Sequence, residues 1–566
     1  MRPSALLPAV LLLFAPTLGA ADFDVRAHGA KGDGTTLDTA AINRAIEAAS
    51  AAGGGTVRFP AGTYLVFSIH LKSNLTLQFD AGATLLAATP SAELGGYDAP
   101  EPNEWGDKLQ YQDFGHSHWH NSLIWGEDLE NIAITGPGRI DGSKGLVRNV
   151  GYGGGRGGRA GAGLNGTLPP SSTPAAPPSD PLRPTGPILG NKAIALKNCR
   201  NVTLRDLSLL LCGHFALLAT GVDHLTLDNV KVDTNRDGFD LDACRHVRVS
   251  NCSVNAPQDD AIVLKASYAL GELRSCEDVT ITNCAVTGYD AGSFLDGTFR
   301  RTMERAPDRD GPTGRIKIGT ESSGSFRNIT IANCTFDRSR GLALETVDGG
   351  VIEDIAITNV TMRDLTTAPI FLRVGNRARG PTGTPIGAIR RVLISHLTVA
   401  NADPRYPSLI AGLPGQPVED ISLSDIHITH RGGLTLDHVA QQPADLINTF
   451  FLRGPSVTGP RDPFAPPEQE KGYPEPSMFG LLPAHALYVR HAKNLSIRDF
   501  SVAFTTADTR PAIVLDDVAT VTFDRTAVQH APTAATFVLR HVTDFTARSI
   551  LGLPDTTRAT AENESL

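Results

Sequence analysis

Apolar and polar positions alternate in short segments that recur along most of the chain. Each segment begins with a polar residue and continues as an alternating run such as Val-Thr-Leu or Ile-Ala-Ile. Clear copies start at Asn201, His224, His246, Asp278, Asn328, Asp354, Arg391, Asp420 and Asn494, and weaker copies at Asn74, Asn131 and Thr520. The closest starts lie 22 to 29 residues apart. Alternation with a period of two predicts β-strands, and recurrence at this spacing predicts a repeat architecture.

An all-β fold, the single-stranded right-handed parallel β-helix, is what this pattern predicts. Leucine-rich repeats have a similar length, but their Leu-x-x-Leu-x-Leu scaffold is absent. Helical repeats need apolar residues about 3.6 positions apart, which these segments lack. The 56 Gly and 38 Pro suit turns between strands. Because each coil of a solenoid contacts only its neighbours, 566 residues can form one domain.

The start of the chain is similar to an export signal. Residues 1–20 contain Arg2, then a short apolar run, then small residues near a possible cleavage point. We therefore expect the mature protein, residues 21–566, to be secreted or periplasmic. No later stretch offers about 20 uninterrupted apolar residues, so no membrane span is expected.

Two further segments depart from the strand pattern. Residues 36–52 are predicted to form a helix that caps the open end of the solenoid, with Ile42, Ile46 and Ala49 on one face. Residues 151–187 are rich in Gly and then in Pro, which predicts a flexible insertion.

Four of the seven Cys follow the repeat rather than a disulfide pattern, and the other three are uninformative. Cys199, Cys252, Cys284 and Cys334 occupy equivalent Asn-Cys positions. We expect them to stack as small apolar residues inside the coil. A disulfide framework, which an exported protein could also have, is the alternative.

Three aspartates carry the most informative chemistry in the chain. Asp237 is followed 22 and 23 residues later by the adjacent pair Asp259 and Asp260. Residues one repeat apart stack at about 4.8 Å in a solenoid, so the alignment places Asp237 beside Asp260, with Asp259 one residue away. Crowded carboxylates raise each other's pKa, which is typical of a functional site. The alternative is that these aspartates have only structural roles, as turn caps and solvated carboxylates.

The motifs of the chain resemble glycoside hydrolase family 28, which includes polygalacturonases and rhamnogalacturonan hydrolases. Residues 23–34, 55–64, 69–74 and 134–142 match segments shared by pectin lyase-like proteins. The family's Asn-Thr-Asp motif is similar to Asn235-Arg236-Asp237, with Arg236 replacing Thr, and its Asp-Asp motif is similar to Asp259-Asp260.

The resemblance implies cofactor-independent hydrolysis of a glycosidic bond with inversion. By the family match, Asp259 is the general acid, while Asp237 and Asp260 bind and activate water, and Asn235 lies at the site. An inverting pair of carboxylates is expected to be roughly 6.5–9.5 Å apart. The pKa of the acid, Asp259, should be raised by its anionic neighbours.

Two departures from the family pattern affect substrate binding. Gly314 stands where the family has a catalytic His, and Ala343 and Glu345 replace an Arg and a Lys that hold the substrate carboxylate. A Glu at that position would repel galacturonate. Other side chains could take part in binding, because arginine forks suit carboxylates: the candidates are Lys265, Arg315, Lys317, Arg373 and Arg377. Structural pairing of these cations with Glu345 or Asp348 is the alternative.

Residues 115–120 hold three histidines, His116, His118 and His120, on one face if the segment is extended. A metal site is one interpretation, but we expect no metal. The other interpretations are a loop in which Trp119 stacks on a sugar and a purely structural loop.

The sequence thus predicts a secreted, inverting glycoside hydrolase that acts on a pectic polysaccharide or oligosaccharide. A lyase-type β-helix protein or a non-catalytic carbohydrate-binding protein remains an alternative. A monomer without nucleic-acid partners is expected, and the net charge of −9 does not change this picture because local fields steer a ligand.

Overall fold

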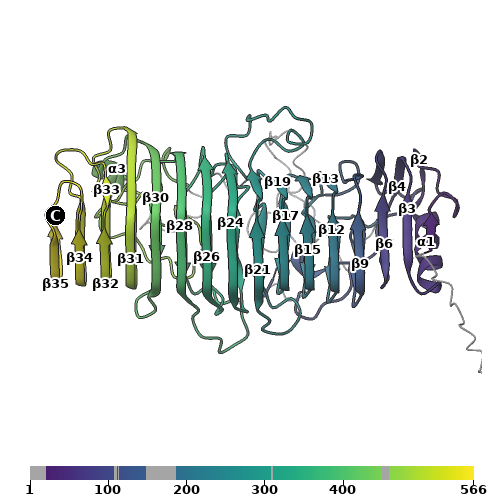
Figure 1. The fold of residues 1–566 in the computed structure, drawn as a ribbon, viewed down its shortest axis with the longest axis horizontal. Coiled ribbons are helices and arrows are strands. Elements are labelled where there is room, and N and C mark those ends of the chain that lie inside the picture. The colour runs from purple at the N-terminus through teal and green to yellow at the C-terminus, as the bar shows by residue number, and fades with distance from the viewer. Residues whose placement is uncertain (1–20, 107–110, 113, 148–185, 308–309, 449–457) are drawn as a thin grey trace, which may run out of the picture.

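The computed structural model describes residues 21–106, 111–112, 114–147, 186–307, 310–448 and 458–566. The predicted export signal at 1–20 and nearly all of the predicted insertion at 151–187 lie outside these residues. The strands stack as successive coils along one long axis (Figure 1). No helix among the described residues combines the length and the apolar character needed to cross a membrane.

Parallel strands form three long ladders that run along the solenoid. The first ladder, which bears the candidate site, contains β5 (Ile69–His70), β8 (Ile124–Glu127), β11 (Lys192–Lys197), β14 (Phe215–Thr220), β17 (Asp237–Asp242), β20 (Ile262–Ala266), β23 (Ile316–Ser322), β25 (Leu342–Thr346), β27 (Ile370–Val374), β29 (Ser408–Ala411), β31 (Leu487–Thr506), β32 (Ile513–Asp524) and β34 (Phe537–Arg548).

The second ladder contains β1 (Asp22–Asp24), β3 (Gly55–Phe59), β6 (Leu75–Phe79), β9 (Glu130–Thr135), β12 (Arg200–Arg205), β15 (Asp223–Asp228), β18 (Arg245–Ser250), β21 (Cys276–Thr282), β24 (Phe326–Asp337), β26 (Val351–Arg363), β28 (Ala388–Ala402) and β30 (Val418–Gly432). The third contains β2 (Asp33–Leu37), β4 (Gly62–Val66), β7 (Ala83–Ala87), β10 (Arg139–Asp141), β13 (Ser208–Leu210), β16 (Lys231–Asp233), β19 (Ser253–Asn255) and β22 (Ala285–Thr287), and short β33 (Ala527–Val528) pairs with β31. The predicted parallel β-helix is confirmed.

The polar residue that opens each repeat has a local structural role. All twelve predicted segment starts have a positive φ, between 53° and 63°. Asn, Asp and His tolerate this left-handed conformation better than most residues, which explains why they recur at these positions. The sequence repeat therefore records a left-handed residue at the same position of each repeat.

Side chains stack in register inside the coil to form the core. Phe239, Ile262 and Ile316 are paired in successive strands of the first ladder and are fully or almost fully buried. All seven Cys are buried and none forms a disulfide. The prediction that they pack as small apolar residues is confirmed.

The two ends of the solenoid are closed differently. Helix α1 (Thr39–Ala51) lies at one end (Figure 1) and buries Ile42, Ile46 and Ala49, the face named from the sequence. At the other end, β35 (Thr556–Ser565) pairs antiparallel with β34. The helix α2 (Phe114–Ser117), the helix α3 (Leu436–Gln441) and the 3₁₀ helix η1 (Pro476–Phe479) lie in connecting segments.

Candidate active site

The outer face of the first ladder changes from apolar to polar and back along the solenoid. Near β11 and β14 it is covered by an apolar cluster around the buried Trp119. Near β25 to β29 it is covered by another, which includes Met478 and Phe479. The strands β17, β20, β23 and β25 carry buried charged side chains between these clusters: Asp237, Asp240, Asp242, Lys265, Lys317 and Glu345. Buried charges persist only when they are paired or used, so this stretch is the candidate site.

The three predicted catalytic aspartates lie together in this stretch. Asp237 begins β17, and the pairing of Phe239 with Ile262 sets it level with Asp260 on the next coil. One carboxylate oxygen from each of Asp237, Asp259 and Asp260 lies within 4.8 Å of the others. The stacking expected from the sequence is present. The carboxylates are closer, however, than the roughly 6.5–9.5 Å expected for an inverting pair.

The three carboxylates differ in accessibility. Asp237 is 2% exposed, and its Oδ1 has no hydrogen-bond partner among the described residues. The Asp259 side chain is 27% exposed, whereas that of Asp260 is 6% exposed. A bulky sugar can therefore reach Asp259 most easily, while Asp237 and Asp260 lie where a water molecule fits better.

Burial, followed by the charge of Asp259, raises the pKa of Asp237 well above its ordinary value. The raised pKa that the sequence predicts for Asp259 stays a prediction, and the structure shows a raised pKa on Asp237 as well. Two carboxylates this close titrate as a pair. The ligand-free site is therefore expected to hold one proton that Asp237 and Asp259 share.

Arg236 and Asn235 position the turn that carries Asp237. The Arg236 Nε donates to the Asp259 Oδ2 at 2.7 Å, so the residue that replaces the family's Thr orients the exposed carboxylate. The Asn235 carbonyl accepts from the Gln258 amide at 3.1 Å, and this bond ties the turn to the next coil. A direct contact of Asn235 with substrate stays a prediction.

Two histidines approach Asp237 from the preceding side of the solenoid. One ring nitrogen each of His116 and His214 lies within 4.8 Å of an Asp237 oxygen and of the other histidine. No such role was predicted for His214 from the sequence, although it precedes Asp237 by 23 residues, about one repeat. Gly314 has no room for the missing family His, because a Cβ there would lie 2.0 Å from the Thr287 carbonyl oxygen.

The same cluster could be considered as a metal site, but its donor atoms have other contacts. The Lys265 Nζ lies 2.6 Å from the His116 Nε2, and the His214 Nδ1 is 3.5 Å from an Arg236 nitrogen. An ammonium and a guanidinium beside the ring nitrogens oppose a second cation. These contacts favour hydrogen-bonded side chains over a metal centre.

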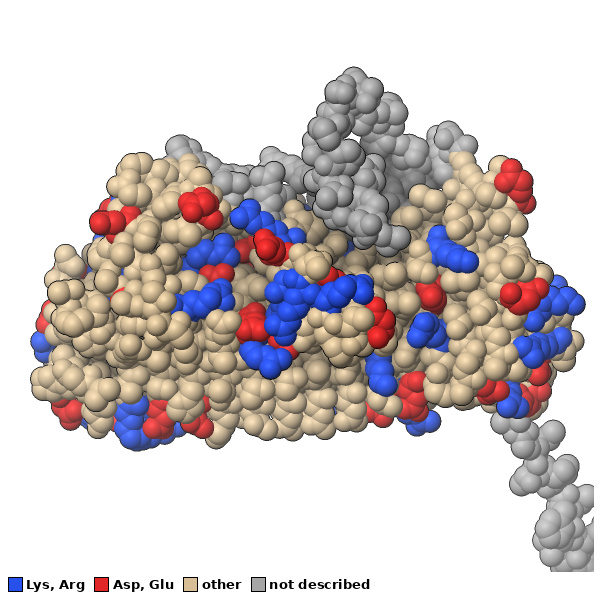
Figure 2. All heavy atoms as spheres, turned by 90° about the horizontal axis from the view of Figure 1, so that it is seen from above, with Lys and Arg blue, Asp and Glu red and all other residues tan. Residues whose placement is uncertain are grey.

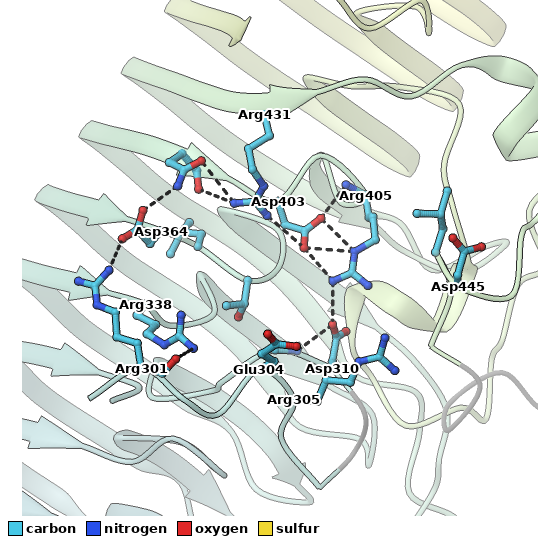
Figure 3. A pocket seen from close by; sticks show the side chains of 15 residues that line it. Arg301, Glu304, Arg305, Asp310, Arg338, Asp364, Asp403, Arg405, Arg431 and Asp445 are labelled. Carbon is cyan, nitrogen blue, oxygen red and sulfur yellow. Dashed lines mark hydrogen bonds and ion pairs between the residues drawn. The ribbon is translucent and has the colours of Figure 1, made fainter. Parts of the chain in front are cut away.

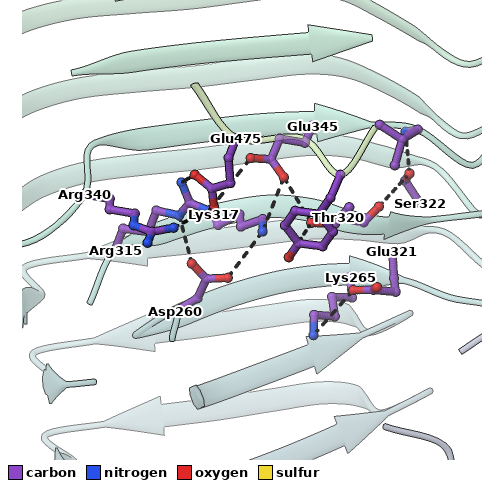
Figure 4. A network of polar contacts seen from close by, with 12 residues as sticks. Asp260, Lys265, Arg315, Lys317, Thr320, Glu321, Ser322, Arg340, Glu345 and Glu475 are labelled. Carbon is purple, nitrogen blue, oxygen red and sulfur yellow. Dashed lines mark hydrogen bonds and ion pairs between the residues drawn. The ribbon is translucent and has the colours of Figure 1, made fainter. Parts of the chain in front are cut away.

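Asp260 is anchored by a buried network of ionic contacts (Figure 4). Its Oδ1 accepts from the Arg315 Nε at 2.8 Å, and its Oδ2 lies 3.5 Å from the Lys317 Nζ. Arg315 also forms an ion pair with Glu475 at 2.5 Å, and Lys317 also forms one with Glu345 at 3.3 Å. Both cations are therefore shared between Asp260 and a further buried acid.

Glu475 was not identified from the sequence. This carboxylate is 3% exposed and also pairs with Arg340 at 2.9 Å. Burial alone would raise the pKa of Glu475, but Arg315 and Arg340 lower it to about 2. A segment distant in sequence thus supplies a permanent negative charge behind Asp260.

Glu345 has the opposite electrostatic balance. Burial raises the pKa of its carboxyl to about 7, although Lys317 and Arg315 lie beside it and act in the other direction. The carboxyl has an ordinary pKa near 4.5 in the unfolded protein. Between about pH 4.5 and pH 7, the folded protein therefore binds more protons than the unfolded protein does. Its stability should then fall as the pH rises through this window.

Replacing Glu345 with Gln is expected to remove that pH dependence. Between about pH 4.5 and pH 7, the free energy of unfolding of the unaltered protein should fall by about 3 kcal/mol relative to Glu345→Gln. Urea denaturation at a series of pH values measures the difference. A flat difference between pH 5 and pH 7 would show that Glu345 titrates normally.

The other predicted substrate-binding cations have protein partners as well. Lys265 lies 2.7 Å from Asp240 and 3.5 Å from Glu321. Arg377 pairs with Asp348 and Glu321, and Arg373 donates to main-chain carbonyls of residues 412 and 468. These contacts favour the structural alternative, and direct binding of substrate by these three residues stays a prediction.

The histidine-rich segment does not form the metal site considered from the sequence. His118 contacts the Phe114 carbonyl, and His120 contacts Glu127, so the histidines point to separate partners. Trp119 is fully buried and donates to Thr220, which excludes the suggested stacking on a sugar. The loop contributes His116 to the site instead.

A separate hollow of about 600 Å³ lies beside the ends of β24, β26, β28 and β30 (Figure 3). None of the three aspartates lines it. Its charges pair within the wall, for example Arg405 with Asp403 at 2.7 Å and Arg301 with Asp364 at 2.9 Å. On the face seen in Figure 2, basic and acidic side chains are interspersed and form no single-sign patch. We therefore place the candidate site at the aspartates.

Comparisons with known proteins agree with this fold. Residues 23–137 match the family model "Rhamnogalacturonase A/epimerase, pectate lyase-like", and residues 189–305 match "Right handed beta helix region". A family 28 exopolygalacturonase of Yersinia enterocolitica has a TM-score of 0.54 at 17% identity, over 94% of this chain and 78% of that one. The class of protein is therefore the right-handed parallel β-helix.

Curated relatives indicate which β-helix proteins this chain is similar to. A probable polygalacturonase of Vitis vinifera is 23% identical over 420 residues, 71% of this chain and 72% of that protein. A 67-residue stretch is 64% identical to mannuronan C5-epimerase AlgE3 of Azotobacter vinelandii, which is 12% of this chain and 4% of the epimerase. The resemblance found in the sequence is confirmed: the chain is a divergent protein similar to glycoside hydrolase family 28.

Proposed function

We propose that this protein is an inverting glycoside hydrolase that cleaves a pectic polysaccharide or oligosaccharide. The observation that carries the proposal is the cluster of Asp237, Asp259 and Asp260, in which the buried Asp237 Oδ1 has no partner among the described residues. A buried polar atom without a partner destabilises the fold. Such an atom is typical of a position kept for a water or a substrate.

The cluster supports one division of roles. Asp259, the exposed member, gives the shared proton to the glycosidic oxygen as the bond to the anomeric carbon breaks. A water between Asp237 and Asp260 attacks that carbon and passes its proton to Asp237. The proton then returns from Asp237 to Asp259, so the site ends each cycle as it began.

Attack by water suits this site better than a covalent intermediate. Both oxygens of Asp260 face buried cations, Arg315 at 2.8 Å and Lys317 at 3.5 Å. Asp237 is buried and has a raised pKa. A carboxylate held in this way is a poor nucleophile and cannot approach a sugar carbon closely, which supports inversion despite the short spacing of the carboxylates.

Arg236, His116 and His214 complete the proposal as positioning residues. Arg236 holds the Asp259 carboxylate, and the two histidines flank Asp237. The residue at position 314 cannot supply a histidine there, because Gly314 has no room for a side chain. Export through residues 1–20 and action as a monomer outside the cytoplasm belong to the same proposal.

The purified protein, incubated with polygalacturonate, rhamnogalacturonan and pectic side-chain oligosaccharides, tests the class of reaction. We expect new reducing ends without the near-ultraviolet absorbance of unsaturated products. Unsaturated products would indicate a lyase. Saccharide binding without any new reducing ends would indicate a non-catalytic protein, and either result would remove the hydrolase proposal.

A further inference from the structure

The cations beside the aspartates are all engaged by acids of the protein. Arg315 and Lys317 are 1% and 2% exposed, and each lies between Asp260 and a second buried carboxylate. Those carboxylates are Glu475 and Glu345. If either cation turned towards a substrate carboxylate, its buried acids would keep fewer cationic partners, which is unfavourable.

The more exposed cations near the site show the same pattern. Arg236 is 17% exposed and holds Asp259 at 2.7 Å. Arg379 is 36% exposed and faces Glu321 at 3.5 Å. Among the described residues near the aspartates, these charges are balanced inside the protein, so a uronate would gain little attraction and would meet nearby carboxylates.

Tyr473 presents a different surface at this position. The residue is 42% exposed, although burial of its hydroxyl end raises the pKa of Tyr473. The hydroxyl lies 3.3 Å from the Thr320 Oγ1, which fixes the direction of the ring. The Lys317 Nζ lies 5.5 Å from the ring centroid. The aromatic face therefore stands beside the ammonium that contacts Asp260.

We propose that the site beside Asp260 binds an uncharged sugar unit, and that the Tyr473 ring is the platform on which this unit stacks. The inference rests on the proposed function and names its substrate class. The negative face of an aromatic ring attracts the slightly positive C–H groups of a neutral sugar. The same face disfavours a carboxylate, and the charges of Glu321 and Asp259, which act on Tyr473, add to this effect.

Matched oligosaccharides that differ only in charge test the inference. Oligosaccharides of polygalacturonate and of rhamnogalacturonan are each compared with their carboxyl-reduced forms, by calorimetric titration of the Asp259→Asn protein and by reducing-end release with the unaltered protein. We expect a carboxyl-reduced form to bind about tenfold more tightly than its parent. Tighter binding of a uronate form, or binding of none of the four, would overturn the inference.

Tyr473 has its own matched pair of variants. Tyr473→Ala is expected to weaken binding of the neutral oligosaccharide about tenfold, while Tyr473→Phe keeps the ring and stays within about twofold. Equal binding by the two variants would contradict the platform. Preferred hydrolysis of polygalacturonate would reject this inference and support the proposed hydrolase function. Binding of the neutral oligosaccharide that depends on Tyr473 but leads to no hydrolysis would support this inference and reject the hydrolase function.

Discussion

Replacing Asp259 with Asn is expected to lower kcat by about 10²–10⁴-fold, the usual contribution of a general acid. The amide cannot give a proton to the leaving oxygen, and Asp259 is the member of the cluster that a sugar can reach. Initial rates of reducing-end release measure the effect. Asp237→Asn and Asp260→Asn should lose comparable activity, because each amide removes one side of the water site.

The nature of the leaving group separates these roles. The acidic phenol of an aryl glycoside leaves as a phenolate without help from a proton. Asp259→Asn should therefore recover most of its activity on such a substrate, while Asp237→Asn and Asp260→Asn should not. Asp228→Asn, at the end of β15 on the second ladder, is the control and should act like the unaltered protein. Recovery by Asp237→Asn instead would assign the acid to Asp237.

Replacing Arg315 with Met is expected to lower the free energy of unfolding by about 3–5 kcal/mol, because it leaves Asp260 and Glu475 buried beside fewer cations. Urea denaturation followed by circular dichroism measures the loss. Methionine is unbranched and apolar and adapts to irregular spaces, so the effect reports mainly the lost charge.

Two further variants make this result specific. Arg363→Met breaks an ion pair whose arginine is 62% exposed, and should change stability little. Arg315→Met combined with Glu475→Gln should recover part of the lost stability, since one of the two carboxylates that lost a cationic partner is removed. A single variant as stable as the unaltered protein would show that the network contributes no net stabilisation.

The repeat made the fold and the aspartate cluster predictable. The left-handed position that opens each repeat favours Asn, Asp or His, and the alternating run that follows encodes a strand, so both signals are local. The stacking of Asp237 beside Asp260 follows from that same period. This is why a chain with about 23% identity to a curated relative still shows its architecture in its sequence.

Contacts made by insertions were not predictable in this way. Glu475 meets Arg315 across 160 residues, and His116 meets Lys265 across 149. No period relates these positions, because they lie in segments that leave the coil and return over its outer face. The sequence offered the pairing of Lys317 with Glu345 only as an alternative to substrate binding, and the burial of the pair was not predicted.

The configuration of the first product tests the central claim most directly. Proton NMR during the first minutes of hydrolysis shows which anomer appears before mutarotation mixes the two. We expect the configuration opposite to that of the bond that was cleaved, as required when water held between Asp237 and Asp260 attacks the anomeric carbon. Retention of configuration would mean that a carboxylate of the cluster forms a covalent intermediate, and would contradict this account.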